Sequence, residues 1–136
     1  MSQVNADTLR HSGGTLGTDV RVKNTSVYES DGGTSVTQNL VQGLVKCWHR
    51  SGNDATVTDS LNVASSTDNG TADYTYTFSN NFSNDDYGRA GQCVTDARRC
   101  QYSRSDDTSN FRVRHWHEDG GYADCENTTL IAGDLA

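Results

Sequence analysis

The sequence predicts an all-β protein, an antiparallel β-sandwich (jelly-roll-like or immunoglobulin-like) preceded by an extended N-terminal arm and one short helix. Three observations support this prediction. Asn, Asp, Ser, Thr and Gly are abundant, and these residues favour turns and strand edges over helix interiors. Only 32% of the 136 residues are hydrophobic, so the core is thin or shared with other chains. After residue 50, short strand patterns alternate with turn sequences at sandwich-like spacing.

Residues 1–34 are predicted to form the arm, with a role in attachment or oligomerisation. They contain two short β-like pieces, "QVNADTLR" and "TDVRVKNTSVY". This segment is too polar to build a core of its own, so it is either flexible or docked on another surface.

Residues 35–43 are predicted to form the short helix. Ser35 and Gln38 match a capping box, which satisfies two backbone N–H groups at a helix start. Gly43 is expected to end the helix, because glycine costs about 1 kcal/mol relative to alanine in a helix interior. Apolar residues recur at helical spacing along this segment and beyond it: Val36, Leu40, Val41, Leu44, Val45 and Trp48.

Residues 44–136 are predicted to form the sandwich, beginning with a strand at 44–50. The clearest element is a hairpin, because Asn69-Gly70 suits a type I′ turn. Alternation in the next strand places three aromatic residues on one buried face: Tyr74, Tyr76 and Phe78. The sandwich is expected to contain six or seven strands in total, and those not yet named lie within 55–66, 92–103, 111–117 and 128–135. Phe82 and Tyr87 are expected to anchor the loop at 80–92.

The charge of the chain argues against nucleic acid as a partner. The formal net charge is −7, and no long Lys/Arg-rich run is present to neutralise phosphates. No stretch approaches the roughly 20 apolar residues of a membrane span. Residues 1–20 lack the apolar centre of a signal peptide. We therefore expect synthesis in the cytoplasm and no membrane insertion.

Four cysteines permit three disulfide pairings, and no C-x-x-C pair indicates a zinc or redox site. Proximity in the sequence favours a Cys93–Cys100 pair, but the connectivity stays open. The cysteines are Cys47, Cys93, Cys100 and Cys125.

Two H-x-H-like spacings are the strongest candidates for metal chemistry. His115 and His117 would share one face of a strand, and copies around a symmetry axis would then supply several imidazoles. Cys47 and His49 repeat this spacing. In both cases we favour the structural interpretation, which is hydrogen-bonded strand histidines and a cysteine packed as a small hydrophobe. The sequence therefore predicts no catalytic, cofactor or metal site, and no cofactor.

Three tyrosines in predicted loops are candidates for contact with a surface ligand such as a host glycan. Tyrosine offers a large contact area with a polar tip. For each of them, however, we favour the interpretation that it packs within its own loop. The candidates are Tyr87, Tyr102 and Tyr122.

Three stretches resemble a family of small virion proteins of marine bacteriophages, of the tail fibre, head fibre or decoration type. They are "TLRHSGGTLGTDVRVKNTSVYESDGGTSVTQNLVQGLVK", "DSLNVASSTDNGTADYTYTFSNNF" and "LIAGDL". The most specific parts are residues 59–78 and "VQGL" at 41–44. The cysteines and histidines are not part of this pattern.

The resemblance implies a non-enzymatic fibre, spike or decoration subunit, located in the virion on a tail or capsid. It implies a homotrimer that contacts other virion proteins through the N-terminal arm, and a sandwich whose loops contact the host surface. The alternative is a carbohydrate-binding or adhesion β-sandwich module of cellular origin. A third class, a small metal- or cysteine-dependent enzyme, has no supporting spacing.

Overall fold

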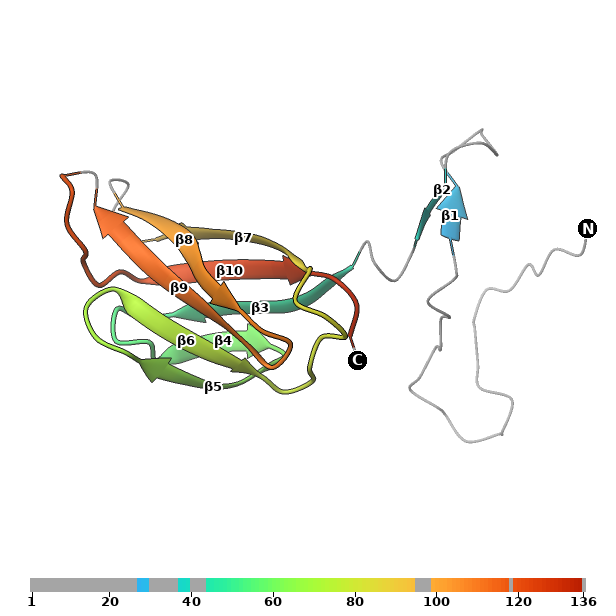
Figure 1. Cartoon of the computed structure of the whole chain (residues 1–136), viewed down its shortest axis with the longest axis horizontal. Helices are drawn as coiled ribbons and strands as arrows, with labels where there is room; N and C mark the ends of the chain where they lie inside the picture. The colour runs from blue at the N-terminus through green and yellow to red at the C-terminus, as the bar shows by residue number, and fades with distance from the viewer. Residues whose placement is uncertain (1–26, 30–36, 40–43, 95–98, 118, 136) are drawn as a thin grey trace, which may run out of the picture. The chain divides into compact units, whose positions relative to one another are not determined.

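The computed structural model describes residues 27–29, 37–39, 44–94, 99–117 and 119–135, and side chains are described from residue 44 onward except at 99–104. The chain divides into two compact units, residues 1–41 and residues 42–136. The boundary lies close to residue 44, where the sandwich was expected to begin. Figure 1 shows the strands of both units.

The described part of the first unit is a two-stranded antiparallel sheet. It consists of β1 (Val27–Glu29) and β2 (Thr37–Asn39), with Tyr28 opposite Gln38. The helix expected over residues 35–43 is therefore wrong at Thr37–Asn39, and the rest of that range lies outside the described residues. Threonine and asparagine are weak helix formers, and antiparallel pairing with β1 outweighs the capping signal.

The second unit is a sandwich of two four-stranded antiparallel sheets, which confirms the predicted fold class (Figure 1). We call them the β3–β10 sheet, with strand order β4-β3-β10-β7, and the β6–β9 sheet, with order β5-β6-β9-β8. The strands are β3 (Val45–Ser51), β4 (Val57–Leu61), β5 (Val63–Asp68), β6 (Asp73–Phe78), β7 (Gly88–Cys93), β8 (Arg99–Asp106), β9 (Asn110–His117) and β10 (Asn127–Ala132).

The strand expected within residues 55–66 is divided between the two sheets at Asn62. This residue has a φ of 62°, a conformation that asparagine tolerates better than most residues. Its side chain holds the crossing in place, because Nδ2 donates to Asn80 O at 3.0 Å and Oδ1 accepts from Asn80 N at 2.7 Å. The chain thus leaves β4 in one sheet and enters β5 in the other.

The hairpin between β5 and β6 is confirmed, but its turn is wider than a type I′ turn. β5 ends at Asp68 and β6 begins at Asp73, so residues 69–72 form the loop. Positive φ angles occur at Gly70 (116°) and Ala72 (61°). Asp68 Oδ1 accepts a hydrogen bond from Gly70 N at 2.8 Å, which fixes the loop from one side.

The core lies between the sheets and is mainly aromatic. The inward face of β6 is buried as predicted. Phe111 and Val113 of β9 extend this face within the same sheet, and Ile131 of β10 contributes to the core from the other sheet. Tyr76 and Phe111 stack with ring centroids 5.2 Å apart. Phe82 and Tyr87 anchor their loop in this core with ring centroids 4.7 Å apart, as expected.

An ion pair joins the two sheets at the β7 and β8 edges. Arg89 Nη1 lies 2.7 Å from Asp106 Oδ1, and the Arg89 side chain is only 10% exposed. The guanidinium also lies 5.4 Å from the centre of the Phe111 ring. Burial lowers the pKa of Arg89, although the charge of Asp106 opposes this.

Candidate functional site

The interior of the sandwich contains a polar network that links the two sheets. His49 Nε2 lies 2.9 Å from Asn127 Oδ1, and Ser51 Oγ lies 2.6 Å from Tyr76 Oη. Asn127 Nδ2 donates to Ser51 Oγ at 2.9 Å. Burial lowers the pKa of His49 to about 4 against the opposing hydrogen bond of Asn127. All four side chains are fully buried, so this network stabilises the fold and meets no substrate in this conformation.

Cys47 and His49 share the inward face of β3, as their spacing predicts, but this face is in the core. Burial raises the pKa of the Cys47 thiol to about 12, which makes the thiolate scarce at neutral pH. Cys47 and Cys125 are free thiols. The Cys100 side chain lies outside the described residues, so the favoured Cys93–Cys100 pair stays a prediction.

His115 and His117 do not form a shared surface pair. His115 is fully buried, and its ring lies 5.1 Å from that of Tyr74 in an edge-on contact. His117 Nδ1 lies 3.1 Å from Asp119 Oδ2. A metal shared between copies would need both imidazoles at the surface, and the burial of His115 excludes that arrangement here. Among the described residues, no three His, Cys, Asp or Glu side chains are placed to hold a metal ion.

Of the three candidate tyrosines, only Tyr122 is seen at the surface. Tyr87 is 8% exposed, and its hydroxyl donates to Asp107 O and Asn110 O at 3.2 Å. Loop packing, the interpretation favoured from the sequence, is therefore confirmed for Tyr87, and it is not a surface contact residue. The Tyr102 side chain lies outside the described residues. Tyr122 is 46% exposed and belongs to a larger group of side chains.

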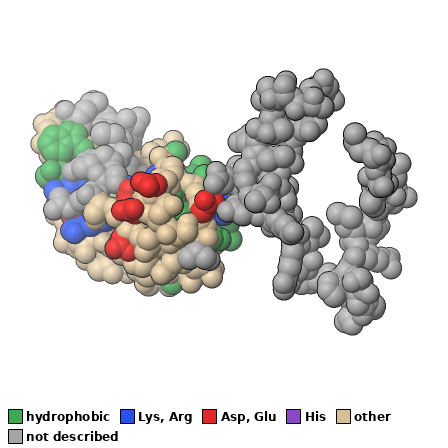
Figure 2. Space-filling view, turned by 45° about the vertical axis from the view of Figure 1, so that its right-hand side comes forward, with side chains coloured by type: hydrophobic (Ala, Val, Ile, Leu, Met, Phe, Trp, Pro, Cys, Tyr) green, Lys and Arg blue, Asp and Glu red, His purple; other side chains and the backbone are tan. Residues whose placement is uncertain are grey.

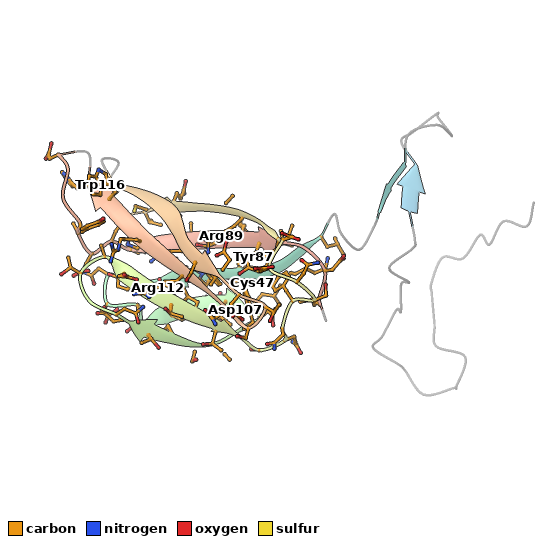
Figure 3. The ribbon with its side chains drawn as sticks, in the orientation of Figure 1. Cys47, Tyr87, Arg89, Asp107, Arg112 and Trp116 are labelled. Carbon is orange, nitrogen blue, oxygen red and sulfur yellow. The ribbon has the colours of Figure 1, made fainter. Side chains whose placement is uncertain are left out.

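This group, the arginine–aromatic cluster, lies on the outer face of the β6–β9 sheet. Strand alternation produces it, because Phe111, Val113 and His115 of β9 are buried and the residues between them point outward. Figure 3 labels Arg112 and Trp116 along β9. The cluster consists of Asp73 from β6, Arg112, Arg114 and Trp116 from β9, and Tyr122 from the following loop.

Asp73 fixes both arginines of the cluster. Its carboxylate accepts from Arg112 Nε at 2.6 Å and Nη2 at 3.0 Å, and from Arg114 Nη2 at 2.8 Å and Nε at 3.2 Å. Burial alone raises the pKa of Asp73, but the hydrogen bonds and charges of both arginines together hold it below its usual value. Asp73 therefore carries its negative charge at neutral pH, although its side chain is only 5% exposed.

The aromatic part of the cluster joins Trp116 of β9 to Tyr122 of the following loop. Trp116 and Tyr122 form an isolated antiparallel bridge, and their rings lie 5.0 Å apart in a perpendicular arrangement. The guanidinium of Arg114 lies 4.5 Å from the centre of the Tyr122 ring, within the range of a cation–π interaction. In Figure 2, basic side chains lie directly beside a hydrophobic patch at one end of the sandwich.

The outer face of the β3–β10 sheet is different. The pairing register aligns four apolar residues across all four strands, and we call this set the apolar row. Leu61 is 47% exposed and Leu130 is 50% exposed. A shallow pocket lined by Ala90, Gly91, Gln92, Thr128 and Leu130 lies at one end of the row. The row consists of Leu61, Trp48, Leu130 and Ala90.

Of the two surface groups, sequence reasoning identified only Tyr122 of the arginine–aromatic cluster, and it did not find the apolar row. The alternating arginines at 112 and 114 were a visible signal for the cluster, but their partner Asp73 is about 40 residues away. The strand expected at 44–50, which contains Trp48, is confirmed by β3 (Val45–Ser51). Its buried face consists of Cys47, His49 and Ser51, so Trp48 lies on the outer face, which the helical spacing of apolar residues did not indicate.

No family model matches the chain, and no curated protein or solved structure matches it. In the part of the chain that the structure describes, no helix is long and apolar enough to cross a membrane. The second unit is a small all-β domain of two packed sheets. Its two outer faces are the surfaces that bear on its function.

Proposed function

We propose that this chain is a non-enzymatic structural subunit of a bacteriophage particle, a fibre, spike or decoration subunit of the tail or capsid. In this proposal the sandwich associates with copies of itself as a homotrimer, and the N-terminal arm contacts other virion proteins. The observation that carries the proposal is the apolar row, which exposes Leu61, Trp48 and Leu130 on a strand-paired surface.

Burial of this row between copies accounts for its composition. Exposed apolar side chains gain roughly 25 cal/mol for each Å² removed from water, and contiguous exposed apolar patches commonly mark protein contacts. Lys46 and Arg50 precede and follow Trp48 on the same outward face of β3, and Arg50 pairs with Glu126. A polar border around an apolar centre is typical of subunit interfaces. Closed symmetric assembly would use one such face on every copy.

One further observation supports a particle subunit. The chain divides into an N-terminal unit and a sandwich, which suits an arm that attaches and a domain that projects.

The first test measures oligomeric state. We expect the full chain to be a trimer by light scattering at micromolar concentration, and the Leu130→Asp variant to be a monomer. The matched control is Ser65→Asp on β5, an exposed position of the other sheet, which should stay trimeric. A monomeric wild-type chain would contradict the proposed assembly.

The second test examines location. Gold-labelled antibodies to the sandwich should mark one structure, tail or capsid, on purified phage particles that carry the gene for this chain. Absence of the chain from such particles by mass spectrometry would overturn the virion proposal.

A cellular carbohydrate-binding or adhesion module is the second candidate, and the arginine–aromatic cluster favours it. Such a module would bind saccharide while being absent from particles. The two functions therefore separate on location, since both allow ligand binding.

A further inference from the structure

We infer that the arginine–aromatic cluster is a binding site for an acidic saccharide, a sugar that carries a carboxylate. The cluster places guanidinium groups and partly exposed aromatic rings side by side on one sheet face. Guanidinium groups match the geometry of carboxylates. Aromatic rings supply the apolar surface that a small-ligand site needs beside its few polar groups.

The arginines are held in place before a ligand arrives. Arg112 uses Nε and Nη2 to hold Asp73, and its side chain remains 32% exposed. In the described part of the chain no partner is recorded for its Nη1, which leaves this group for a ligand carboxylate. Because Asp73 fixes the guanidinium in the free protein, less side-chain entropy is lost on binding.

The local charge suits a single carboxylate. Two arginines and one aspartate give the cluster a net charge of 2 − 1 = +1, on a chain whose formal charge is −7. Two other carboxylates nearby in the fold are already engaged. Asp119 lies beside His117, and Asp124 accepts from Ala72 N at 2.6 Å and from Tyr74 Oη at 3.1 Å. A polyanion such as nucleic acid would meet repulsion from the rest of the chain.

The aromatic rings favour a sugar over a simple carboxylate. Tyr122 is 46% exposed, and Trp116 and Arg114 support its ring. A rigid tyrosine offers contact area at low entropic cost, and the C–H face of a sugar ring would pack on it. Along β9, Arg112 and Trp116 are separated by about 13 Å at the usual rise of a strand, so the site extends beyond one carboxylate. Polar groups continue this face on β6, where Thr75 accepts from Asn69 Nδ2 at 2.8 Å.

This inference rests on the proposed function only for the source of the ligand, which would be the surface of the host cell. The binding itself is measured on the purified chain. A trimer that binds no acidic saccharide would leave the particle proposal intact, whereas a monomer that binds one would leave only the ligand inference standing.

The two tryptophans make a direct test available. The chain has only Trp48 and Trp116, so in the Trp48→Phe variant all tryptophan fluorescence reports on the cluster. We expect galacturonate and sialyllactose, which carry one carboxylate each, to change this fluorescence in a saturable way. Their neutral counterparts, the methyl ester of galacturonate and lactose, should bind at least tenfold more weakly. Equal binding of the acidic and neutral sugars, or no binding of any at millimolar concentration, would overturn the inference.

Calorimetric titration of variants then locates the site. Arg112→Gln and Tyr122→Ala should each weaken binding at least tenfold, and Arg112→Lys should weaken it less. Arg50→Gln, on the opposite sheet, is the matched control and should bind like wild type. Tyr122→Ala leaves the Asp73 ion pairs intact, so it tests the site even if Arg112→Gln does not fold. Unchanged binding in folded Tyr122→Ala would overturn the assignment.

Discussion

The two outer faces of the sandwich are built by the same strand alternation but have opposite chemistry. Trp48 lies on the β3–β10 sheet in line with Leu61 and Leu130, whereas Trp116 lies on the β6–β9 sheet near two arginines that hold a buried carboxylate. In the β3–β10 sheet the polar network lies on the inner side, at His49. In the β6–β9 sheet the polar groups lie on the outer side, at Asp73. The ion pairs of Asp73 stabilise the outer face of the β6–β9 sheet, whereas the apolar row has exposed side chains that we propose a partner covers.

The largest expected effect is a pH-dependent change in the free energy of unfolding, and it comes from His49 on the inner side of the β3–β10 sheet. The pKa of His49 is lowered to about 4 in the folded chain, against about 6.5 in an unfolded one. Between these values the unfolded state binds more protons, so the free energy of unfolding falls as the pH is lowered, by about 3 kcal/mol at pH 4. Urea unfolding at pH 7 and pH 4 measures this change.

His49→Gln should remove most of this dependence, because its amide remains neutral and still reaches Asn127. If the variant and the wild type lost stability equally between these pH values, His49 would not be the group responsible. The buried network at His49 would then make no pH-dependent contribution to stability that sets the β3–β10 sheet apart from the β6–β9 sheet.

The next effect concerns the outer side of the β6–β9 sheet. Asp73→Asn removes the charge that two arginines share, and we expect a loss of about 2 kcal/mol, below the range for a fully buried pair because both arginines are partly exposed. The folded-state pKa of Asp73 is depressed. Its contribution is therefore present above about pH 4 and lost as the pH falls further.

Asp59→Asn, on the outer side of the β3–β10 sheet, is the matched control. Asp59 accepts a hydrogen bond only from Ser60 N among the contacts described for it, and it is exposed. Its replacement should change stability by no more than about 0.5 kcal/mol. Thermal unfolding measures both variants. If Asp73→Asn and Asp59→Asn lost equal stability, the carboxylate of the β6–β9 face would contribute no more than that of the β3–β10 face.

The smallest change in stability is expected for a substitution in the apolar row. Leu130→Thr exchanges a side chain that is 50% exposed for one with good strand propensity. Under conditions where the chain is monomeric, we expect a change within about 0.5 kcal/mol. Ile131→Ala, one residue away and 1% exposed, should cost about 3 kcal/mol. A large loss in the monomeric Leu130→Thr variant would mean that the row serves the fold and is not reserved for a partner.

Local patterns predicted the parts of the fold that depend on neighbouring residues. Alternation at 73–78 identified β6 and its buried aromatic face, since a strand has a period of two residues. The same reasoning failed for β7, whose sequence GRAGQC contains no apolar alternation. This strand is defined by its pairing with β10, which is a tertiary contact.

The arginine–aromatic cluster and the apolar row were harder to predict than the strands, because both depend on how distant strands pair. Asp73 and Arg114 meet because β6 and β9 pair in a register that places them opposite each other, and no local pattern encodes that register. The apolar row likewise requires the alignment of β4, β3, β10 and β7. The histidine and cysteine spacings were visible in the sequence, but Cys47, His49 and His115 are buried in the core, which the spacing alone did not show.

The pairing of β3 with β10 has a mechanical consequence. Val45 at the start of β3 lies opposite Ala132 at the end of β10, so the chain enters and leaves the sandwich at the same end (Figure 1). A force pulling these two ends apart would break the hydrogen bonds of this ladder one after another, because they lie across the strands and are loaded in turn. A force between β3 and a molecule held on β9 would instead have to shear one sheet over the other. The domain should therefore resist tension from its side surface better than tension between its two chain ends.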